Sequence, residues 1–166
     1  FPTRRSSDLT ASFASDERFH ALRMPLDQNW KFAVIIPDYE VRTADARRAM
    51  PKEIAVKDSV FTTSHAIAMI EALRSGSEEL LAEACQDVLH EPCRRKLIKD
   101  YDSVRASAKA AGAPAFFISG SGSTMIALTK SETVAERFIE LVRARHPNFA
   151  GHVLHAASDG VHVETK

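Results

Sequence analysis

Three apolar runs rich in β-branched and aromatic side chains indicate where the strands of this chain lie. The run Phe32–Ile36 in KFAVIIPDYEV predicts a buried strand that ends at Pro37. In FFISGSGSTMIALT (116–129) five small residues interrupt the apolar pattern, which predicts a strand, a glycine-containing turn and a second strand. The last run, GHVLHAASDGVHVETK (151–166), predicts two short strands joined by a turn at Asp159-Gly160.

Apolar residues at helical spacing predict the elements between these strands. A short helix is expected to begin at Thr43, whose side-chain oxygen can cap it, and to end before Pro51. A helix over 57–73 is expected to turn one stripe inward, made of Thr63, Ala66, Ile67, Ile70 and Leu73, and to stop at Gly76. The segment SEELLAEACQDVL (77–89) is expected to form the next helix, with Leu80, Leu81 and Ala84 inward. Two further helices are expected over 100–111 and through Val134, Phe138, Leu141 and Val142, and Pro147 ends the second of them. Pro92 is expected to break the helical pattern between 77–89 and 100–111.

The order of these elements is strand, several helices, two strands, helix and strand. It predicts the α+β class, in which helices cover one face of an antiparallel sheet. The specific expectation is a ferredoxin-like antiparallel sheet with helices inserted after the first strand. Because the sequence shows no internal repeat and no low-complexity linker, it predicts a single domain over 10–166.

Composition narrows the classes of partner. With 166 residues, 45% hydrophobic content, six glycines and seven prolines, the chain can bury a real core. Lys+Arg and Asp+Glu both number 22, so no excess charge favours nucleic acid or an anionic membrane. Two cysteines, Cys85 and Cys93, are too few for a disulfide framework, and this indicates a reduced, cytoplasmic location. No apolar stretch is long enough to span a bilayer.

The first nine residues, FPTRRSSDL, resemble the conceptual translation of a sequencing-adaptor oligonucleotide. Residues 1–9 are therefore expected to be non-native, and the alternative is a short polar natural terminus. An adaptor fused in frame would imply that the gene continues upstream and that this chain is a C-terminal fragment.

The glycine break in 116–129 is the first candidate site. Successive backbone N–H groups in a Ser/Gly turn can bind a phosphate or carboxylate, and a plain β-hairpin turn is the alternative. GSGS lacks the Lys-Ser/Thr of a Walker loop, and position 125 is Met, so no G-x-G-x-x-G is present. No G-x-S-x-G nucleophile elbow occurs either. The seven histidines have no zinc-ligand spacing with a cysteine, so no metal site is predicted.

Two arginine pairs are the second candidate, Arg47-Arg48 after the first strand and Arg94-Arg95 after Pro92. Arginine pairs are most often solvated surface. The alternative is geometric, because Arg47 lies near a helix start and Arg94 at a proline-fixed bend. One guanidinium from each could hold a single small carboxylate.

Taken together, VIIPDYEVRTADARRAMPKEI (34–54), LHEPCRRKLI (89–98) and FFISGSGSTMIAL (116–128) resemble successive sequence blocks of the homoserine kinase family, within the GHMP small-molecule kinase superfamily. The resemblance runs from about residue 10 to 163. It implies the GHMP kinase C-terminal domain and ATP-dependent phosphorylation of the homoserine hydroxyl in threonine biosynthesis. It also allows a homodimer of the full-length enzyme.

The resemblance carries over to particular residues. Arg47 and Arg94 fall on the two positions that bind the substrate carboxylate in the family. The family's glycine-rich motif falls on Ser119, Gly120, Ser121, Gly122, Ser123 and Thr124. The chain departs from the family at four positions, where Cys93, Ser123, Thr62 and His65 replace the usual Tyr, Pro, Asn and Arg. No catalytic residue is assigned within this chain.

The phosphate loop of the family, Pro-x-x-x-Gly-Leu-Gly-Ser-Ser, is absent from the sequence. The resemblance therefore implies that ATP and Mg²⁺ are bound mainly by an N-terminal domain that this chain lacks. Such a fragment should be inactive alone and should expose apolar surface where that domain packs. Two alternatives stay open: a GHMP kinase for a mevalonate-like, sugar or amino-alcohol substrate, and a non-catalytic ferredoxin-like module that binds a metabolite.

Overall fold

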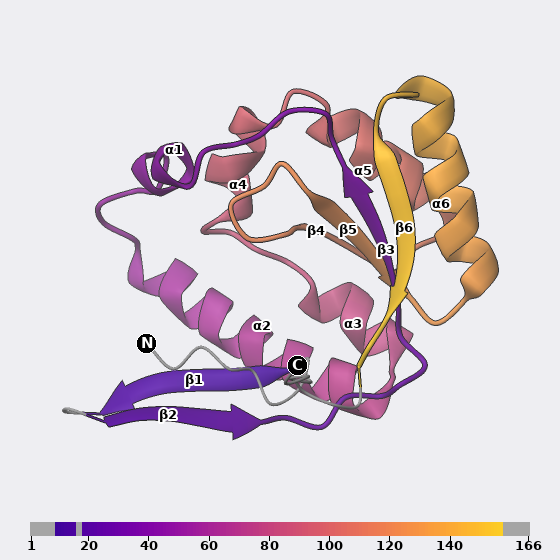
Figure 1. Cartoon of the computed structure of the whole chain (residues 1–166). Helices are drawn as coiled ribbons and strands as arrows, with labels where there is room; N and C mark the ends of the chain where they lie inside the picture. The colour runs from indigo at the N-terminus through magenta and orange to yellow at the C-terminus, as the bar shows by residue number, and fades with distance from the viewer. Residues whose placement is uncertain (1–8, 16–17, 158–166) are drawn as a thin grey trace, which may run out of the picture.

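The main sheet has four strands in the order β4-β5-β3-β6 (Figure 1). This computed structural model describes residues 9–15 and 18–157. The strands are β1 (Thr10–Ser15), β2 (Arg18–Arg23), β3 (Lys31–Ile36), β4 (Ala115–Ile118), β5 (Met125–Thr129) and β6 (Ala150–His155). The helices are α1 (Thr43–Arg48), α2 (Val56–Ser75), α3 (Glu78–Ala84), α4 (Glu91–Arg94), the 3₁₀ turn η1 (Arg95–Leu97), α5 (Tyr101–Ala111) and α6 (Glu132–Arg145).

Every neighbouring pair in this sheet is antiparallel. The chain enters at β3, passes through five helices to β4 and β5, and returns through α6 to β6, which lies beside β3. With α5 and α6 as its two crossover helices, this is the ferredoxin-like order, and α1 to α4 form the insertion after the first strand. The predicted fold class is confirmed.

One face of the sheet packs against α5 and α6. Ala33 pairs with Ala127 across β3 and β5, and these small side chains let the helices approach the sheet closely. The core on this face comprises Ala33, Ile35, Met125 and Ala127 from the sheet, Val104 and Ala108 from α5, and Phe138, Ile139 and Val142 from α6. The alternation of Phe32, Ala33, Val34 and Ile35 along β3 sends every second residue into this core.

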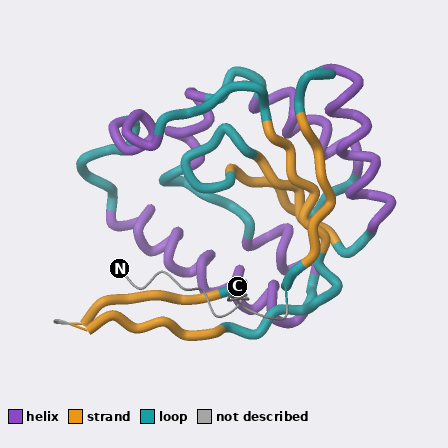
Figure 2. The backbone as a smooth tube through the Cα atoms, viewed as in Figure 1, coloured by secondary structure: helices purple, strands orange, loops and turns teal. Residues whose placement is uncertain are grey.

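The opposite face is also covered in part, which corrects the expectation of helices on one face only. Trp30, which is fully buried, packs there with Leu128, Ala72 of α2 and Leu81 of α3. The Trp30 indole N–H donates to the Leu73 carbonyl at 2.9 Å, so the C-terminal end of α2 is fixed to the start of β3. Figure 2 shows α2 running away from the sheet beyond this contact.

The predicted helices are present in the structure, but several of them begin or end at other residues than predicted. α1 begins at Thr43 as expected, but the N-cap is Arg42 and no side chain caps the helix. α3 ends at Ala84, earlier than predicted, because the next backbone turn is organised around Asp87. Pro92 does not break a helix: it lies in the first turn of α4, where its missing N–H costs nothing.

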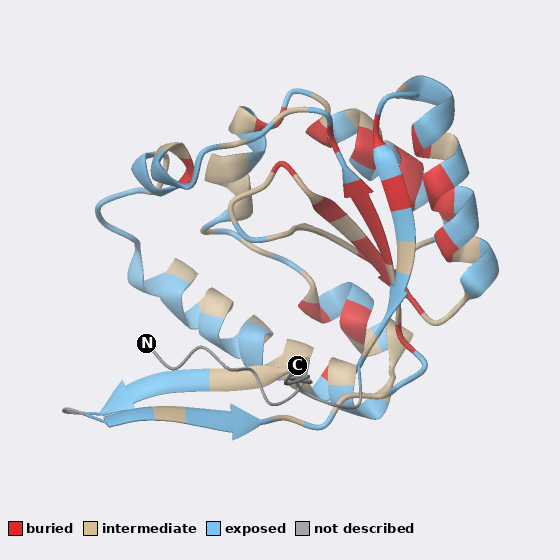
Figure 3. Cartoon of the chain, viewed as in Figure 1, coloured by how far each residue is buried: buried red, intermediate tan, exposed pale blue. Residues whose placement is uncertain are grey.

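The predicted inward stripe of α2 is wrong over its N-terminal part. Thr63, Ala66 and Ile67 are exposed, with Ile67 at 65%, and Figure 3 shows the exposed surface of this helix. Ala72 is buried and Leu73 half-buried near the sheet. Gly76 ends the helix in a left-handed conformation (φ +72°), as predicted.

A second, two-stranded sheet formed by β1 and β2 was not predicted. Its register pairs Thr10 with Arg23 and Ser15 with Arg18. At the other end of the chain, β6 confirms the first of the two predicted terminal strands, whereas the turn at Asp159-Gly160 lies outside the described residues. Residues 1–8 of the adaptor-like segment lie outside them too. Among the described residues, none of the helices is long and apolar enough to cross a membrane.

Candidate functional site

The glycine-rich segment 119–124 is the loop that connects β4 to β5. Inside it, the Ser119 N–H donates to Thr124 O at 2.9 Å and the Gly122 N–H to Ser119 O at 3.0 Å. Gly120 and Gly122 both have positive φ, +60° and +86°, a region that glycine adopts without strain. The N–H groups of Ser119 and Gly122 are thus committed to the turn itself, and they fix its backbone.

Three neighbours hold this loop in place. The Arg94 guanidinium donates from Nη1 to the Gly120 carbonyl at 2.6 Å. The Ser123 hydroxyl donates to Tyr39 O, in the segment between β3 and α1. The hydroxyls of Ser121 and Thr43 lie 3.5 Å apart. The loop therefore lies between the α4 segment on one side and the β3–α1 segment on the other.

Arg94 is the last residue of the four-residue helix α4, which is too short to be stable alone. The Asp87 carboxylate fixes the start of this helix by accepting the backbone N–H groups of Leu89, His90 and Glu91 at 2.7, 2.8 and 3.1 Å. Glu91 in turn accepts a hydrogen bond from the buried Tyr101 hydroxyl. Burial, followed by the Glu91 carboxylate, raises the pKa of Tyr101, so this hydroxyl stays protonated and donates.

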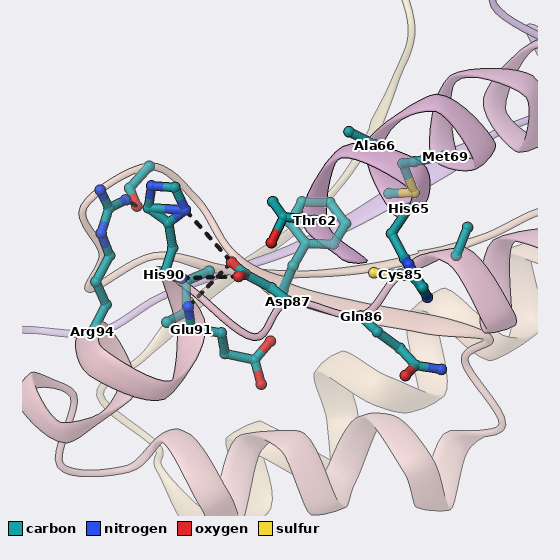
Figure 4. Close-up of a pocket in the computed structure, with 14 residues that line it drawn as sticks. Thr62, His65, Ala66, Met69, Cys85, Gln86, Asp87, His90, Glu91 and Arg94 are labelled. Carbon is teal, nitrogen blue, oxygen red and sulfur yellow. Dashed lines mark hydrogen bonds and ion pairs between the residues drawn. The ribbon is translucent and has the colours of Figure 1, made fainter. Parts of the chain in front are cut away.

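A pocket of about 380 Å³ lies beside the loop, between α2 and α4 (Figure 4). Arg94 and Gly120 line it together, and α2 contributes Thr62, His65 and Met69. Within the described residues the Arg94 Nε atom is buried and has no hydrogen-bond partner. A buried guanidinium N–H without a partner is suited to an anionic group of a ligand.

The two predicted arginines are placed differently. Arg94 lies at the loop and in the pocket, whereas the Arg47 side chain on α1 is exposed. A second hollow, lined by 36–43 and 122–124, lies on the α1 side of the loop. Arg47 lines neither hollow, although the Thr43–Ser121 contact brings the start of its helix to the loop.

Sequence reasoning missed most of the pocket wall. Thr62, His65, Asp87 and His90 were given no role, because they come together only when α2 folds beside the α3–α4 turn. The one local signal was Asp87 just ahead of the Glu91-Pro92 pair, a spacing typical of a capped helix start. In the described part of the chain, no group of three His, Cys, Asp or Glu side chains could hold a metal ion.

Cys85 in the pocket wall gives a pH-dependent prediction. Burial raises the pKa of its thiol to about 11, above the ordinary value of about 8.5. In the native chain, alkylation of Cys85 should be slow at about pH 8 and should rise towards pH 11, because only the thiolate reacts. The native state disfavours the thiolate, so this group's contribution to stability is complete below about pH 8.5 and declines above it.

The measurement is the alkylation rate at Cys85 in a Cys93→Ser background, with the urea-unfolded chain as control. The unfolded chain should show its midpoint near pH 8.5. The same pH profile in both states would show that burial does not protect this thiol.

The two loop glycines give a matched pair of substitutions. A Cβ at Gly120 would meet no atom within 4 Å, whereas one at Gly122 would lie 2.8 Å from Cδ1 of the buried Ile98. Gly120→Ala should therefore cost about 1–2 kcal/mol from the positive φ alone. Gly122→Ala should cost about 1 kcal/mol more because of crowding. Urea unfolding of the two variants measures this difference, and equal stability would contradict the close approach of Ile98 to the loop.

The fold and the loop define a class of protein when they are compared with known families. Residues 69–148, which run from α2 through the glycine-rich loop and α6, match the family model described as GHMP kinases C terminal. The chain therefore carries a GHMP kinase C-terminal domain.

The individual curated relatives to which the chain is similar are homoserine kinases. The chain is 40% identical over 136 residues to the homoserine kinase of Prochlorococcus marinus (strain NATL1A), covering 82% of this chain and 43% of the relative. It is 34% identical over 146 residues to that of Aquifex aeolicus (strain VF5), covering 85% and 48%. This chain thus spans less than half the length of these curated relatives.

The chain is also similar to the solved structure of a homoserine kinase. The homoserine kinase of Cytophaga hutchinsonii superposes with a TM-score of 0.77 at 28% identity, covering 88% of this chain and 47% of that one. The mevalonate kinase of L. major superposes with a TM-score of 0.63 at 17% identity, covering 89% and 48%. At that identity the second likeness shows the shared fold alone.

Proposed function

We propose that this chain is the C-terminal part of a homoserine kinase, which transfers the γ-phosphoryl group of ATP to the homoserine hydroxyl. The observation that carries the proposal is the 40% identity to a homoserine kinase along 82% of the chain. The pocket supports it, because a guanidinium with a buried, unpartnered N–H stands beside the glycine-rich loop. A mevalonate-type substrate has no comparable support, since the likeness to the mevalonate kinase extends only to the fold.

In this proposal the C-terminal part positions the substrate. Phosphoryl transfer depends mainly on orientation and charge stabilisation. Arg94, and Arg47 from the far side of the loop, would hold the homoserine carboxylate so that its hydroxyl faces the phosphate. The loop 119–124 would form the wall where both substrates meet. Its backbone is fixed by Arg94, Tyr39 and its own turn before any substrate arrives.

ATP and Mg²⁺ are assigned to the N-terminal domain of the full-length protein, because the described residues contain neither a phosphate loop nor a cluster able to hold a metal ion. Exposed apolar side chains support the docking of such a domain. Val56, Val60 and Ile67 on α2 are 81%, 63% and 65% exposed. Exposed apolar side chains gathered on one helix are typical of an interaction surface. A cytoplasmic location, a role in threonine biosynthesis and a homodimer of the full-length enzyme belong to the same proposal.

The test is an assay of ADP release by the full-length protein with homoserine, mevalonate, a sugar and an amino alcohol. We expect phosphorylation of homoserine by the full-length protein and none by residues 1–166 alone. Preference for another substrate would instead identify a different GHMP kinase. Metabolite binding by the 166-residue chain, without any kinase activity in the full-length protein, would indicate a non-catalytic module.

A further inference from the structure

The segment 37–42 links β3 to α1 and forms one wall of the second hollow, opposite the glycine-rich loop. Figure 1 shows this link running from the end of β3 to α1. Side chains of the loop contact the link at two places: the Ser123 hydroxyl donates to Tyr39 O, and the hydroxyls of Ser121 and Thr43 lie 3.5 Å apart. The two walls of the hollow are therefore joined by groups of the loop itself.

Of these two contacts, the one made by Ser123 is the stronger. Ser123 is only 6% exposed, and a buried hydroxyl is stable only when it is hydrogen-bonded. Tyr39 O is the acceptor for this hydroxyl. Thr43, in contrast, is exposed, and 3.5 Å is too long for a strong hydrogen bond between hydroxyls. The position of the link relative to the loop therefore depends mainly on Ser123.

Tyr39 is itself held in place by residues from other parts of the chain. Its side chain packs against the main core, and its ring lies edge-on to the buried Phe149, with 6.3 Å between the ring centres. On the ring lies the Lys99 ammonium group, 4.6 Å from its centre, where a cation and an aromatic face attract each other. Burial raises the pKa of the Tyr39 hydroxyl, so the side chain stays neutral. The carbonyl that Ser123 contacts thus belongs to a fixed residue.

The short helix α1 depends on the link that precedes it. It has six residues, its N-cap Arg42 provides no side-chain hydrogen bond, and Ala46 is the residue of this helix that is buried. A helix of this length is not stable by itself, so contacts outside it decide where it lies. The hydrogen bond between Ser123 and Tyr39 therefore also fixes where Arg47, on α1, stands relative to the loop.

We propose that Ser123 is a positioning residue: through Tyr39 O it holds α1, and with it Arg47, in a fixed place beside the glycine-rich loop. This rests on the proposed function, which puts Arg47 and the loop around homoserine. Ser123 acts through Tyr39 and α1, because its hydroxyl is already bound to the Tyr39 carbonyl. The loop and the helix then move as one wall when the substrate binds.

Ser123→Ala removes the hydroxyl and tests the proposal in the full-length kinase. We expect the KM for homoserine to rise about fivefold, as for the loss of one neutral hydrogen bond, and the KM for ATP to stay unchanged. In an Arg47→Ala background the same substitution should have little further effect, because residues that act through one another are not additive. An equal rise in the two backgrounds, or no rise in the wild-type background, would overturn the proposal.

Ser107→Ala is the matched control, because it also removes a buried hydroxyl that donates to a backbone carbonyl. Ser107 is 1% exposed and donates to Ser103 O at 3.0 Å, both within α5. This variant should lose stability in urea unfolding and keep the KM for homoserine. A rise in that KM as large as in Ser123→Ala would mean that Ser123 contributes to stability alone.

Hydrogen exchange measures the same coupling without a substrate. In the full-length protein, Ser123→Ala should speed exchange about fivefold at the amides of Asp45 and Ala46, which donate to Arg42 O in α1. The amides of Leu89 and His90, which Asp87 binds on the other side of the loop, should exchange as before. Unchanged exchange in α1 would overturn the proposal whatever the substrate is. Failure of the wild-type protein to phosphorylate homoserine would count against the proposed function alone.

Discussion

Replacement of Arg94 by alanine is expected to raise the KM for homoserine about ten- to a hundredfold and to leave the KM for ATP nearly unchanged. The guanidinium is held by its 2.6 Å hydrogen bond to Gly120 O, and its Nε–H is buried without a partner among the described residues. A charge-assisted hydrogen bond formed at such a site is stronger than one formed in open solvent. Arg94→Lys should recover little, because an ammonium cannot contact Gly120 and the substrate with the same planar geometry.

Arg47→Ala is the informative comparison. Both arginines carry the same proposed role, but Arg47 is exposed in this domain and lines neither hollow. Its removal should also raise the KM for homoserine more than that for ATP, by a smaller factor than the removal of Arg94, because solvent weakens its interactions. Steady-state kinetics of the full-length protein measure both factors. Equal changes in the KM of homoserine and ATP would exclude a carboxylate-binding role for either residue.

Trp30→Ala is expected to destabilise the fold by about 3–5 kcal/mol. The side chain is fully buried between the sheet and the helices α2 and α3, and its indole N–H donates to Leu73 O. Trp30→Phe should cost less, because it retains much of the apolar contact and loses the hydrogen bond. Since this contact fixes the C-terminal end of α2, the helix that carries Thr62 and His65, the loss should also weaken binding in the pocket.

Ile67→Ala is the matched control for this prediction. Ile67 lies on the same helix and is 65% exposed, so its replacement should change the free energy of unfolding by no more than about 0.5 kcal/mol in this chain. Urea unfolding of the 166-residue chain measures both variants. Equal destabilisation would mean that α2 is not fixed to the sheet through Trp30.

Much of the fold could be predicted because its signals are local. The β-branched run before Pro37 defines β3, and Gly76 ends α2 with a positive φ that favours glycine. The β1–β2 hairpin was missed because no buried alternating face marks its strands, and Phe13 and Phe19 are each about half exposed. The inward stripe on α2 was wrong because helical spacing shows that a face is apolar but not what covers it. In this domain the N-terminal part of that face is left exposed.

For the candidate site, too, some features could be predicted from the sequence and others were decided only by the tertiary structure. The sequence by itself determined the glycine-rich loop and the arginine at position 94, because glycine and arginine have distinctive local chemistry and stand in recognisable blocks. Only the tertiary structure decided that Arg94 meets Gly120 and shares a pocket with Thr62, residues 26 and 32 positions away, while Arg47 stays exposed. The physical reason is that hydrogen bonding and burial depend on which elements pack together, as in the contact of Trp30 with Leu73, which lies far from it in sequence and fixes α2 beside the sheet.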